Sequence, residues 1–193
     1  MANTFFISDT HFGHSNILTF DTYEGTKLRT FDSVEAMDEH MVERWNSVVR
    51  DGDTVYHLGD VVIAQKNLPI IQRLKGKKRL IRGNHDIFKT KKYIEVGFTE
   101  VRGVHVMNDF ILSHIPLHPD SITTRFGVNV HGHLHGNRVR QASGFDKKTK
   151  QVTYGDRIDP RYFSVCVEKL VDYTPMDIDS LRENIRRQKE MYD

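Results

Sequence analysis

The stretch that decides the fold is FFISDTH, residues 5–11, in which a short apolar strand runs directly into a loop carrying Asp9 and His11. Four later stretches repeat this arrangement: VYHLGD at 55–60, LIRGNHD at 80–86, FILSH at 110–114 and VNVHGHLH at 128–135. In open α/β sheets, ligands bind beyond the carboxyl ends of the strands. Five such junctions in order therefore predict that metal-ligand side chains collect at one sheet edge and form a polynuclear metal site.

The composition is typical of a globular protein with a sizeable core. The chain has 193 residues, 38% hydrophobic and 28% charged, so we expect one domain over residues 1–193. Its net charge of +2 is too small to indicate a nucleic-acid-binding protein. The single cysteine, Cys166, excludes an internal disulfide and lies in an apolar stretch, which indicates a buried thiol. The N-terminus lacks the pattern of a signal peptide and no apolar run has the length of a membrane span, so we expect a cytoplasmic protein.

Strand and helix patterns alternate in the first half of the chain, and strand patterns dominate the second half, which predicts an α/β fold. The clearest helix covers residues 31–49, where Asp32 and Glu35 have the spacing of a capping box. A closing helix is expected over residues 177–191. Residues 142–159 are polar and rich in turn-forming residues, and we expect a mobile excursion there.

The five motifs resemble those of the calcineurin-like metallophosphoesterase superfamily, and they stand in the order of that family: Asp9-x-His11, Gly59-Asp60, Gly83-Asn84-His85, His114 and Gly132-His133-x-His135. Residues 6–17 look more specifically like a small single-domain branch found in bacteria, archaea and phages. The resemblance implies a double β-sandwich flanked by helices in four layers, with a dinuclear metal site at one end. It covers the chain from residue 9 to residue 135.

The resemblance also implies a role for each residue of the site. The first divalent ion is expected to have the ligands Asp9, His11, Asp60 and His135. The second is expected to have the ligands Asp60, Asn84, His114 and His133, so that Asp60 bridges the two ions. His85 stands at the position of the general acid and completes a catalytic set with Asp60 and Asn84; it could instead orient a ligand. His57 and His131 lie inside apolar strands, and we interpret them as buried histidines that are not direct ligands.

Four residues beside the ligand loops are candidates for contacts with a substrate phosphate: His14, Asn16, Arg82 and Arg138. His14 and Asn16 follow the first motif closely and could equally cap its loop. Arg82 and Arg138 could each clamp a phosphate with two parallel hydrogen bonds, or they could simply be solvated.

The chemistry of these residues favours phosphate as the substrate group. Two divalent ions bring four positive charges, which Asp9 and Asp60 offset only in part. Two ions about 3.5–4 Å apart can hold a phosphate and lower the pKa of bound water from about 15.7 to about 7, which gives a hydroxide nucleophile. Oxygen and imidazole ligands without thiolate suit Mn²⁺, with Fe²⁺, Zn²⁺ or Ni²⁺ as alternatives.

Three functions compete. The leading one is a metal-dependent phosphoesterase acting on a small soluble phosphoester, a phosphodiester or a nucleotide, because few residues remain beyond the core fold for recognising a large substrate. The second is a nuclease acting on DNA or RNA ends, which the basic runs at residues 75–79 and 89–92 allow. The third is a protein-binding scaffold of the same fold, which the complete set of ligands and His85 disfavours. The sequence leaves the oligomeric state open.

Overall fold

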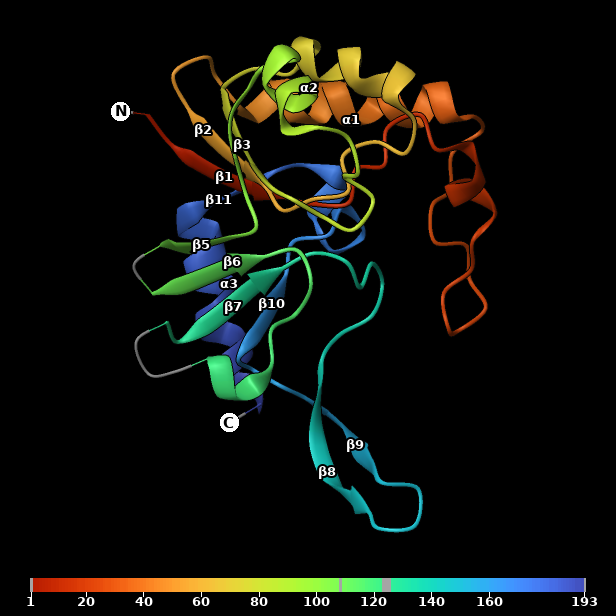
Figure 1. Cartoon of the computed structure of the whole chain (residues 1–193), viewed down its shortest axis with the longest axis vertical. Coiled ribbons are helices and arrows are strands. Elements are labelled where there is room, and N and C mark those ends of the chain that lie inside the picture. The colour runs from red at the N-terminus through yellow and green to blue at the C-terminus, as the bar shows by residue number, and fades with distance from the viewer. Residues whose placement is uncertain (1, 108, 123–125, 193) are drawn as a thin grey trace.

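The computed structural model describes residues 2–107, 109–122 and 126–192. A five-stranded mixed sheet forms one layer of it, and four of its strands come from the first half of the chain or just beyond (Figure 1). Its strands lie in the order β11-β1-β2-β3-β4, with the bounds Met176–Asp177, Thr4–Ile7, Thr54–His57, Lys77–Ile81 and Phe98–Arg102. The pairs from β1 to β4 are parallel, and β11 joins β1 antiparallel. Because parallel strands point the same way, the carboxyl ends of β1, β2 and β3 meet at one edge.

A four-stranded sheet lies beneath the first one in the view of Figure 1. Its strands lie in the order β10-β7-β6-β5, with the bounds Tyr162–Ser164, Val128–His131, Phe110–Ser113 and Val104–Met107. The pairs β10–β7 and β7–β6 are parallel, and β5 joins β6 antiparallel. The carboxyl ends of β6 and β7 therefore also meet at one edge.

Helices cover the two sheets. Within the described residues the α-helices are α1 (Val34–Val48), α2 (Thr90–Glu95) and α3 (Ile178–Tyr192), and Figure 1 shows α1 and α2 on the outer side of the first sheet and α3 behind the second. Short 3-10 helices lie at Ser15–Thr19, Gln65–Arg73, Pro119–Ser121, Val167–Lys169 and Val171–Tyr173. None of the described helices has both the length and the apolar character needed to cross a membrane.

Helix α1 shows why the core forms where it does. Met37, Met41 and Trp45 recur at helical spacing and are at most 1% exposed, so one face of the helix packs into the core. Burying each such side chain contributes about 1.5–3 kcal/mol. The helix begins one residue later than the expected capping box: Ser33, rather than Asp32, accepts the hydrogen bond from the Ala36 backbone N–H.

The α/β class predicted from the sequence is confirmed. The excursion expected at residues 142–159 is formed by an antiparallel hairpin, β8 (Arg140–Asp146) and β9 (Gln151–Ile158), which pair with each other in a separate two-stranded sheet. The mobility expected of this segment stays a prediction. Figure 1 shows that this hairpin projects away from the rest of the molecule. Its polar strands lack a buried face, which explains why no alternating apolar pattern marks them in the sequence.

Candidate metal centre

The five strand–loop junctions meet where the edges of the two sheets come together. Asp9 follows β1, Asp60 follows β2, Asn84 and His85 follow β3, His114 follows β6, and His133 and His135 follow β7. The His133 backbone N–H donates to the Asp9 carboxylate at 2.9 Å, and this bond links the loop of one sheet to the loop of the other. The fold thus brings together side chains that are up to 126 residues apart in the sequence.

Two groups of side chains each offer ligand atoms that lie within 4.8 Å of one another. One group is Asp9, His11 and His135, and the other is Asp60, His114 and His133. The Asp60 Oδ2 atom lies between them, 3.7 Å from His11 Nε2 and 3.4 Å from His114 Nε2. The Asn84 Oδ1 atom is 2.9 Å from His114 Nε2 and extends the second group. The two groups fit a dinuclear metal site.

His11 shows most directly that the residues fit a metal. Both of its ring nitrogens are buried and have no hydrogen-bond partner among the residues that the structure describes. Burial lowers the pKa of His11 to about 2, so the ring is neutral and offers a lone pair. A buried polar atom without a partner costs about 1–3 kcal/mol. A metal ion bound at Nε2 would remove part of that cost.

Hydrogen bonds orient the other imidazoles for metal binding. His114 Nδ1 donates to the Leu58 carbonyl at 2.7 Å, and His135 Nδ1 donates to the Glu168 carboxylate at 3.0 Å. With Nδ1 protonated, the Nε2 atom of each ring faces the carboxylates. Burial alone would lower the pKa of His114, but the hydrogen bond to Asp60 and the charges of Asp9 and Asp60 together outweigh burial and raise it. A metal ion at Nε2 would compete with a proton for the same lone pair.

The carboxylate at the centre is ionised. Burial alone would raise the pKa of Asp60, but the hydrogen bond from His114 and the charges around it lower that pKa to about 2. The Asp86 carboxylate holds the loop in place, because it accepts hydrogen bonds from the backbone N–H groups of Asp60 (2.8 Å), Val61 (3.1 Å) and Gly83 (2.8 Å). Asp86 therefore has a structural role and fixes the loop that carries Asp60.

Backbone strain is concentrated at the candidate ligands. Five of them have a positive φ angle, namely Asp9 (58°), His11 (48°), Asp60 (57°), His133 (71°) and His135 (48°). A non-glycine residue in this conformation costs about 1–3 kcal/mol and persists only where the surrounding structure enforces it. Such strain is common at functional sites, so it supports a functional role for these loops.

Two glycines, Gly59 and Gly132, directly precede candidate ligands and allow the backbone geometry of the site. Gly59 has a φ angle of 92°, a conformation that glycine adopts without steric cost. A Cβ atom on Gly132 would lie 2.5 Å from the Asp9 Oδ2 atom and 2.7 Å from Ser8 Oγ. Any side chain at residue 132 would therefore displace the Asp9 carboxylate.

Sequence reasoning missed a buried ion pair beneath the centre. Arg29 Nε lies 2.8 Å from Glu168 Oε1, and the same guanidinium donates to the carbonyls of Asp9 (2.5 Å) and Thr10 (2.9 Å). Glu168 in turn accepts the hydrogen bond from His135. The Arg29–Glu168 pair thus fixes the backbone of the Asp9 loop and the orientation of His135. The only signal in the sequence is that Glu168 follows directly on the apolar run at residues 165–167.

Cys166 has the buried structural role expected of it. The thiol donates to Asp9 Oδ2 at 3.2 Å, and burial raises its pKa well above the usual value, so it stays protonated. His57 and His131 are also buried, and burial lowers their pKa values to about 3 and about 4. The His57 Nε2 atom lies 3.0 Å from the Thr10 hydroxyl, so this ring braces the first loop.

His85 lies at the open side of the centre. Its side chain is 53% exposed, and its Nε2 atom is 4.0 Å from Asp60 Oδ2. The His85 backbone N–H donates to Asp60 Oδ1 at 2.9 Å, which fixes the position of the residue relative to the bridging carboxylate. The His85 ring can therefore contact a substrate that is bound next to the two groups of candidate ligands.

The four candidate substrate contacts lie in different environments. The His14 ring is 5.7 Å from the His11 ring, centroid to centroid, and Asn16 is exposed on the first 3-10 helix. Arg82 donates to the Phe88 carbonyl at 2.6 Å and lies over the Tyr93 ring, so it holds its own loop. Arg138 is exposed and lines two cavities. A role in substrate binding stays a prediction for all four.

We expect Glu168→Gln to weaken Mn²⁺ binding by about 10–100-fold, because the amide removes the charge that holds His135 in its ligand orientation. Isothermal titration of the metal-free chain with Mn²⁺ measures this change. The matched control is Glu183→Gln, which makes the same substitution on the exposed face of α3. Equal affinity in both variants would contradict the role given to Glu168.

The chain is similar to proteins from archaea, phages and bacteria. It is 33% identical over 194 residues to the uncharacterized protein MJ1445 of Methanocaldococcus jannaschii, across 98% of this chain and 94% of that protein. The Gene 66 protein of Mycobacterium phage L5 is 38% identical over 92 residues, which cover 45% of this chain and 41% of that protein. No family model matches the chain.

Solved structures extend the similarity to the fold. The crystal structure of a protein of unknown function, AQ665 from Aquifex aeolicus, matches with a TM-score of 0.64 at 27% identity, over 95% of this chain and 100% of that chain. The match to Pseudomonas putida nuclease MPE has a TM-score of 0.46 at 20% identity, over 78% of this chain and 67% of that chain, and it is too slight to carry an argument. The match to MJ1445 establishes kinship, and the match to AQ665 establishes a shared fold over nearly the whole chain.

Proposed function

The chain belongs to the family of the uncharacterized protein MJ1445 of Methanocaldococcus jannaschii, and we propose that it is a metal-dependent phosphoesterase of the calcineurin-like superfamily. The observation that carries the proposal is the position of the Asp60 carboxylate between two groups of potential ligands. The proposal includes the four-layer double β-sandwich of that superfamily, which the two sheets and their covering helices support.

Seven side chains would hold two divalent ions, with Mn²⁺ as the preferred metal and Fe²⁺, Zn²⁺ or Ni²⁺ as alternatives: Asp9, His11, Asp60, Asn84, His114, His133 and His135. When bound, the ions would orient a phosphate and lower the pKa of water towards about 7. The chain supplies only the two carboxylates of Asp9 and Asp60 as negative ligands, so the loaded site stays positive and attracts an anion. The hydrogen-bonded histidines hold this geometry before the substrate arrives.

His85 would donate the proton that the leaving oxygen needs. Its exposed ring lies beside the centre, and its backbone bond to Asp60 sets its distance from the substrate phosphate. General acid catalysis of this kind contributes about 10²–10⁴-fold. The protein-binding scaffold has no comparable support, because a scaffold does not require His85 or an intact ligand set.

The first test is hydrolysis of bis-para-nitrophenyl phosphate. We expect the purified chain to hydrolyse this diester with Mn²⁺, to lose activity when a chelator removes the metal, and to regain activity when Mn²⁺ is restored. Release of para-nitrophenolate gives the rate, and elemental analysis gives the metal content. Failure to hydrolyse any aryl phosphoester with Mn²⁺, Fe²⁺, Zn²⁺ or Ni²⁺ would contradict the proposed function.

A second test separates proton donation from metal binding. His85→Ala should keep both metal ions but slow the cleavage of esters with poor leaving groups by about 10²–10⁴-fold, whereas para-nitrophenyl esters should change far less because para-nitrophenolate leaves without a proton. The control is His118→Ala, since His118 is exposed and lies outside the centre, directly before the 3-10 helix Pro119–Ser121. An equal loss on both kinds of ester would mean that His85 positions the site rather than donating a proton.

A further inference from the structure

A cleft of about 750 Å³ opens directly beside the candidate metal centre. One wall is the loop that carries Tyr23, and the opposite wall is the base of the β8–β9 hairpin with Arg138 and Arg140. Glu168, which bonds His135, lies in its lining. The cleft adjoins the first group of candidate ligands through Glu168 and through Gly136, the neighbour of His135, and it extends from there to the base of the hairpin.

The positive charge of the chain is concentrated on this side. Residues 138–158 contain six basic and two acidic residues, a net charge of +4, so the rest of the chain carries −2. The mild total of +2 conceals this separation. Lys147, Lys148 and Lys150 at the tip of the hairpin are exposed, and their side chains form no hydrogen bond or ion pair within the described part of the chain.

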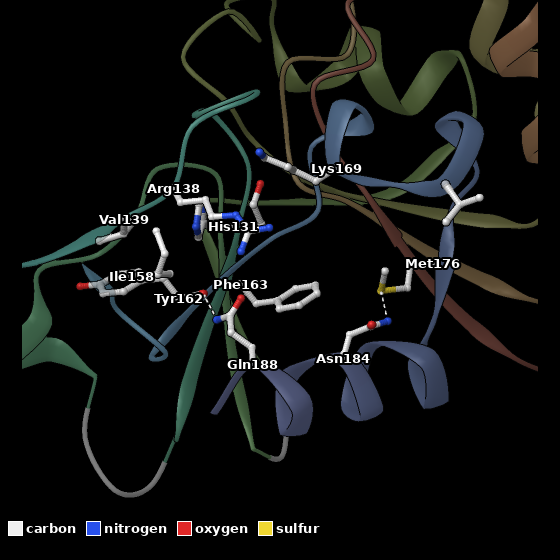
Figure 2. A pocket seen from close by; sticks show the side chains of 12 residues that line it. His131, Arg138, Val139, Ile158, Tyr162, Phe163, Lys169, Met176, Asn184 and Gln188 are labelled. Atoms are coloured by element: carbon white, nitrogen blue, oxygen red, sulfur yellow. Dashed lines mark hydrogen bonds between the residues drawn. The ribbon is translucent and has the colours of Figure 1, made fainter. Parts of the chain in front are cut away.

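The cations nearest the centre are also available to an anion. Arg138 has no hydrogen bond or ion pair with any residue that the structure describes, and Lys169 donates to the Gly136 carbonyl. Both residues line the cleft and also a smaller neighbouring cavity of about 240 Å³, where Figure 2 shows them on the same side as His131. The described lining of that smaller cavity contains no carboxylate.

Exposed aromatic side chains accompany these cations. Tyr23 in the cleft is 92% exposed, and on the hairpin Tyr154 is 64% and Phe145 56% exposed. Phe145 is paired with Val152 across the hairpin, and Tyr154 lies two residues after Val152 on β9. Phe145, Val152 and Tyr154 therefore share one face of the hairpin. Proteins that bind single strands combine such basic grooves with aromatic rings on which unpaired bases stack.

We propose that the cleft and the hairpin bind a single-stranded nucleic acid and hold one of its phosphodiesters at the metal centre; this rests on the proposed phosphoesterase function. The observations favour this occupant over a second copy of the chain, because two copies of residues 138–158, each with a net charge of +4, repel each other. They favour a single strand over a duplex, because the bases of a duplex are already stacked and hide their faces from Tyr154 and Phe145.

The test measures binding of a fluorescein-labelled 12-nucleotide deoxythymidine strand to the full chain by anisotropy, in EDTA so that no cleavage occurs. Lys147→Gln/Lys148→Gln/Lys150→Gln should reduce the slope of log K against log salt by about 2, since each phosphate contact on a single strand contributes about 0.7. Lys89→Gln/Lys91→Gln/Lys92→Gln removes the same charge near α2 and should leave the slope unchanged. Tyr154→Ala should weaken binding about tenfold or more, and Tyr154→Phe should not.

With Mn²⁺, the hairpin variants should cleave the strand more slowly and hydrolyse bis-para-nitrophenyl phosphate at the wild-type rate. Hydrolysis of the small diester without binding of the strand would overturn this inference alone, whereas no hydrolysis of either substrate would overturn the proposed function itself. Equal losses in the two triple variants, equal affinity for a duplex, or binding to phosphatidylserine vesicles without binding to the strand would each overturn the proposed occupant.

Discussion

Asp60→Asn is expected to remove both metal ions from the chain and to reduce diester hydrolysis by at least about 10³-fold. The Asp60 Oδ2 atom is within 4 Å of the Nε2 atoms of His11 and His114, which belong to different groups of candidate ligands. The substitution therefore removes a negative charge that both groups share. Without coordination, the pKa of water returns towards about 15.7 and hydroxide is no longer supplied at neutral pH. Elemental analysis and the rate of para-nitrophenolate release measure the two effects.

The fold should survive this substitution. Asparagine keeps the oxygen that accepts the His85 backbone N–H. The Asp86 carboxylate accepts its hydrogen bonds from backbone N–H groups of Asp60 and Val61, which the substitution leaves unchanged. The control is Asp120→Asn, which makes the same change at an exposed carboxylate. Two metals per chain in Asp60→Asn would show that Asp60 is not the shared ligand.

Arg29→Ala is expected to lower the free energy of unfolding by about 3–5 kcal/mol, because it leaves the buried Glu168 carboxylate without its cation. Both side chains are almost fully buried, at 0% and 5% exposure. Burial raises the pKa of Glu168, but Arg29 and the hydrogen bond from His135 hold it at about 2, so the carboxylate stays charged in the folded protein. For a chain of this size the melting temperature should fall by about 6–20 °C.

Thermal and urea unfolding measure this loss. Arg73→Ala, at an exposed pair with Glu39, is the matched control and should cost about 1 kcal/mol or less. The double variant Arg29→Met/Glu168→Gln should recover part of the stability, because it removes both charges together. A loss in Arg29→Ala no larger than in Arg73→Ala would contradict the role of the buried pair.

The grouping of the candidate ligands could be predicted from the sequence because each of their loops follows an apolar strand. That signal is local, and parallel pairing then places the carboxyl ends of β1, β2 and β3 at one edge and those of β6 and β7 at another. That these edges belong to two sheets, and not to the one sheet expected, depends on packing between the sheets, which the motifs do not encode. The α/β class follows from the same alternation. The helix at residues 31–49 is also marked locally, but two neighbouring residues, Asp32 and Ser33, are both suitable caps, and only the Ser33 hydrogen bond decides between them.

The features that the sequence does not reveal depend on distant contacts. Arg29 and Glu168 are 139 residues apart, and neither belongs to a motif. The separation of charge is equally hidden, since a net charge of +2 does not tell where the basic residues lie. The separation of charge becomes apparent only when the structure places residues 138–158 beside the centre. This placement favours a strand of nucleic acid over a small phosphoester as the proposed substrate.

The most direct test of a dinuclear phosphoesterase centre is a titration of the metal-free chain with Mn²⁺, with bound metal and hydrolysis of bis-para-nitrophenyl phosphate measured at each step. We expect two Mn²⁺ ions to bind per chain, and we expect activity to reach its maximum only as the second ion is taken up. Full activity in the metal-free chain, or at a single bound ion in a chain that takes up no second one, would contradict it.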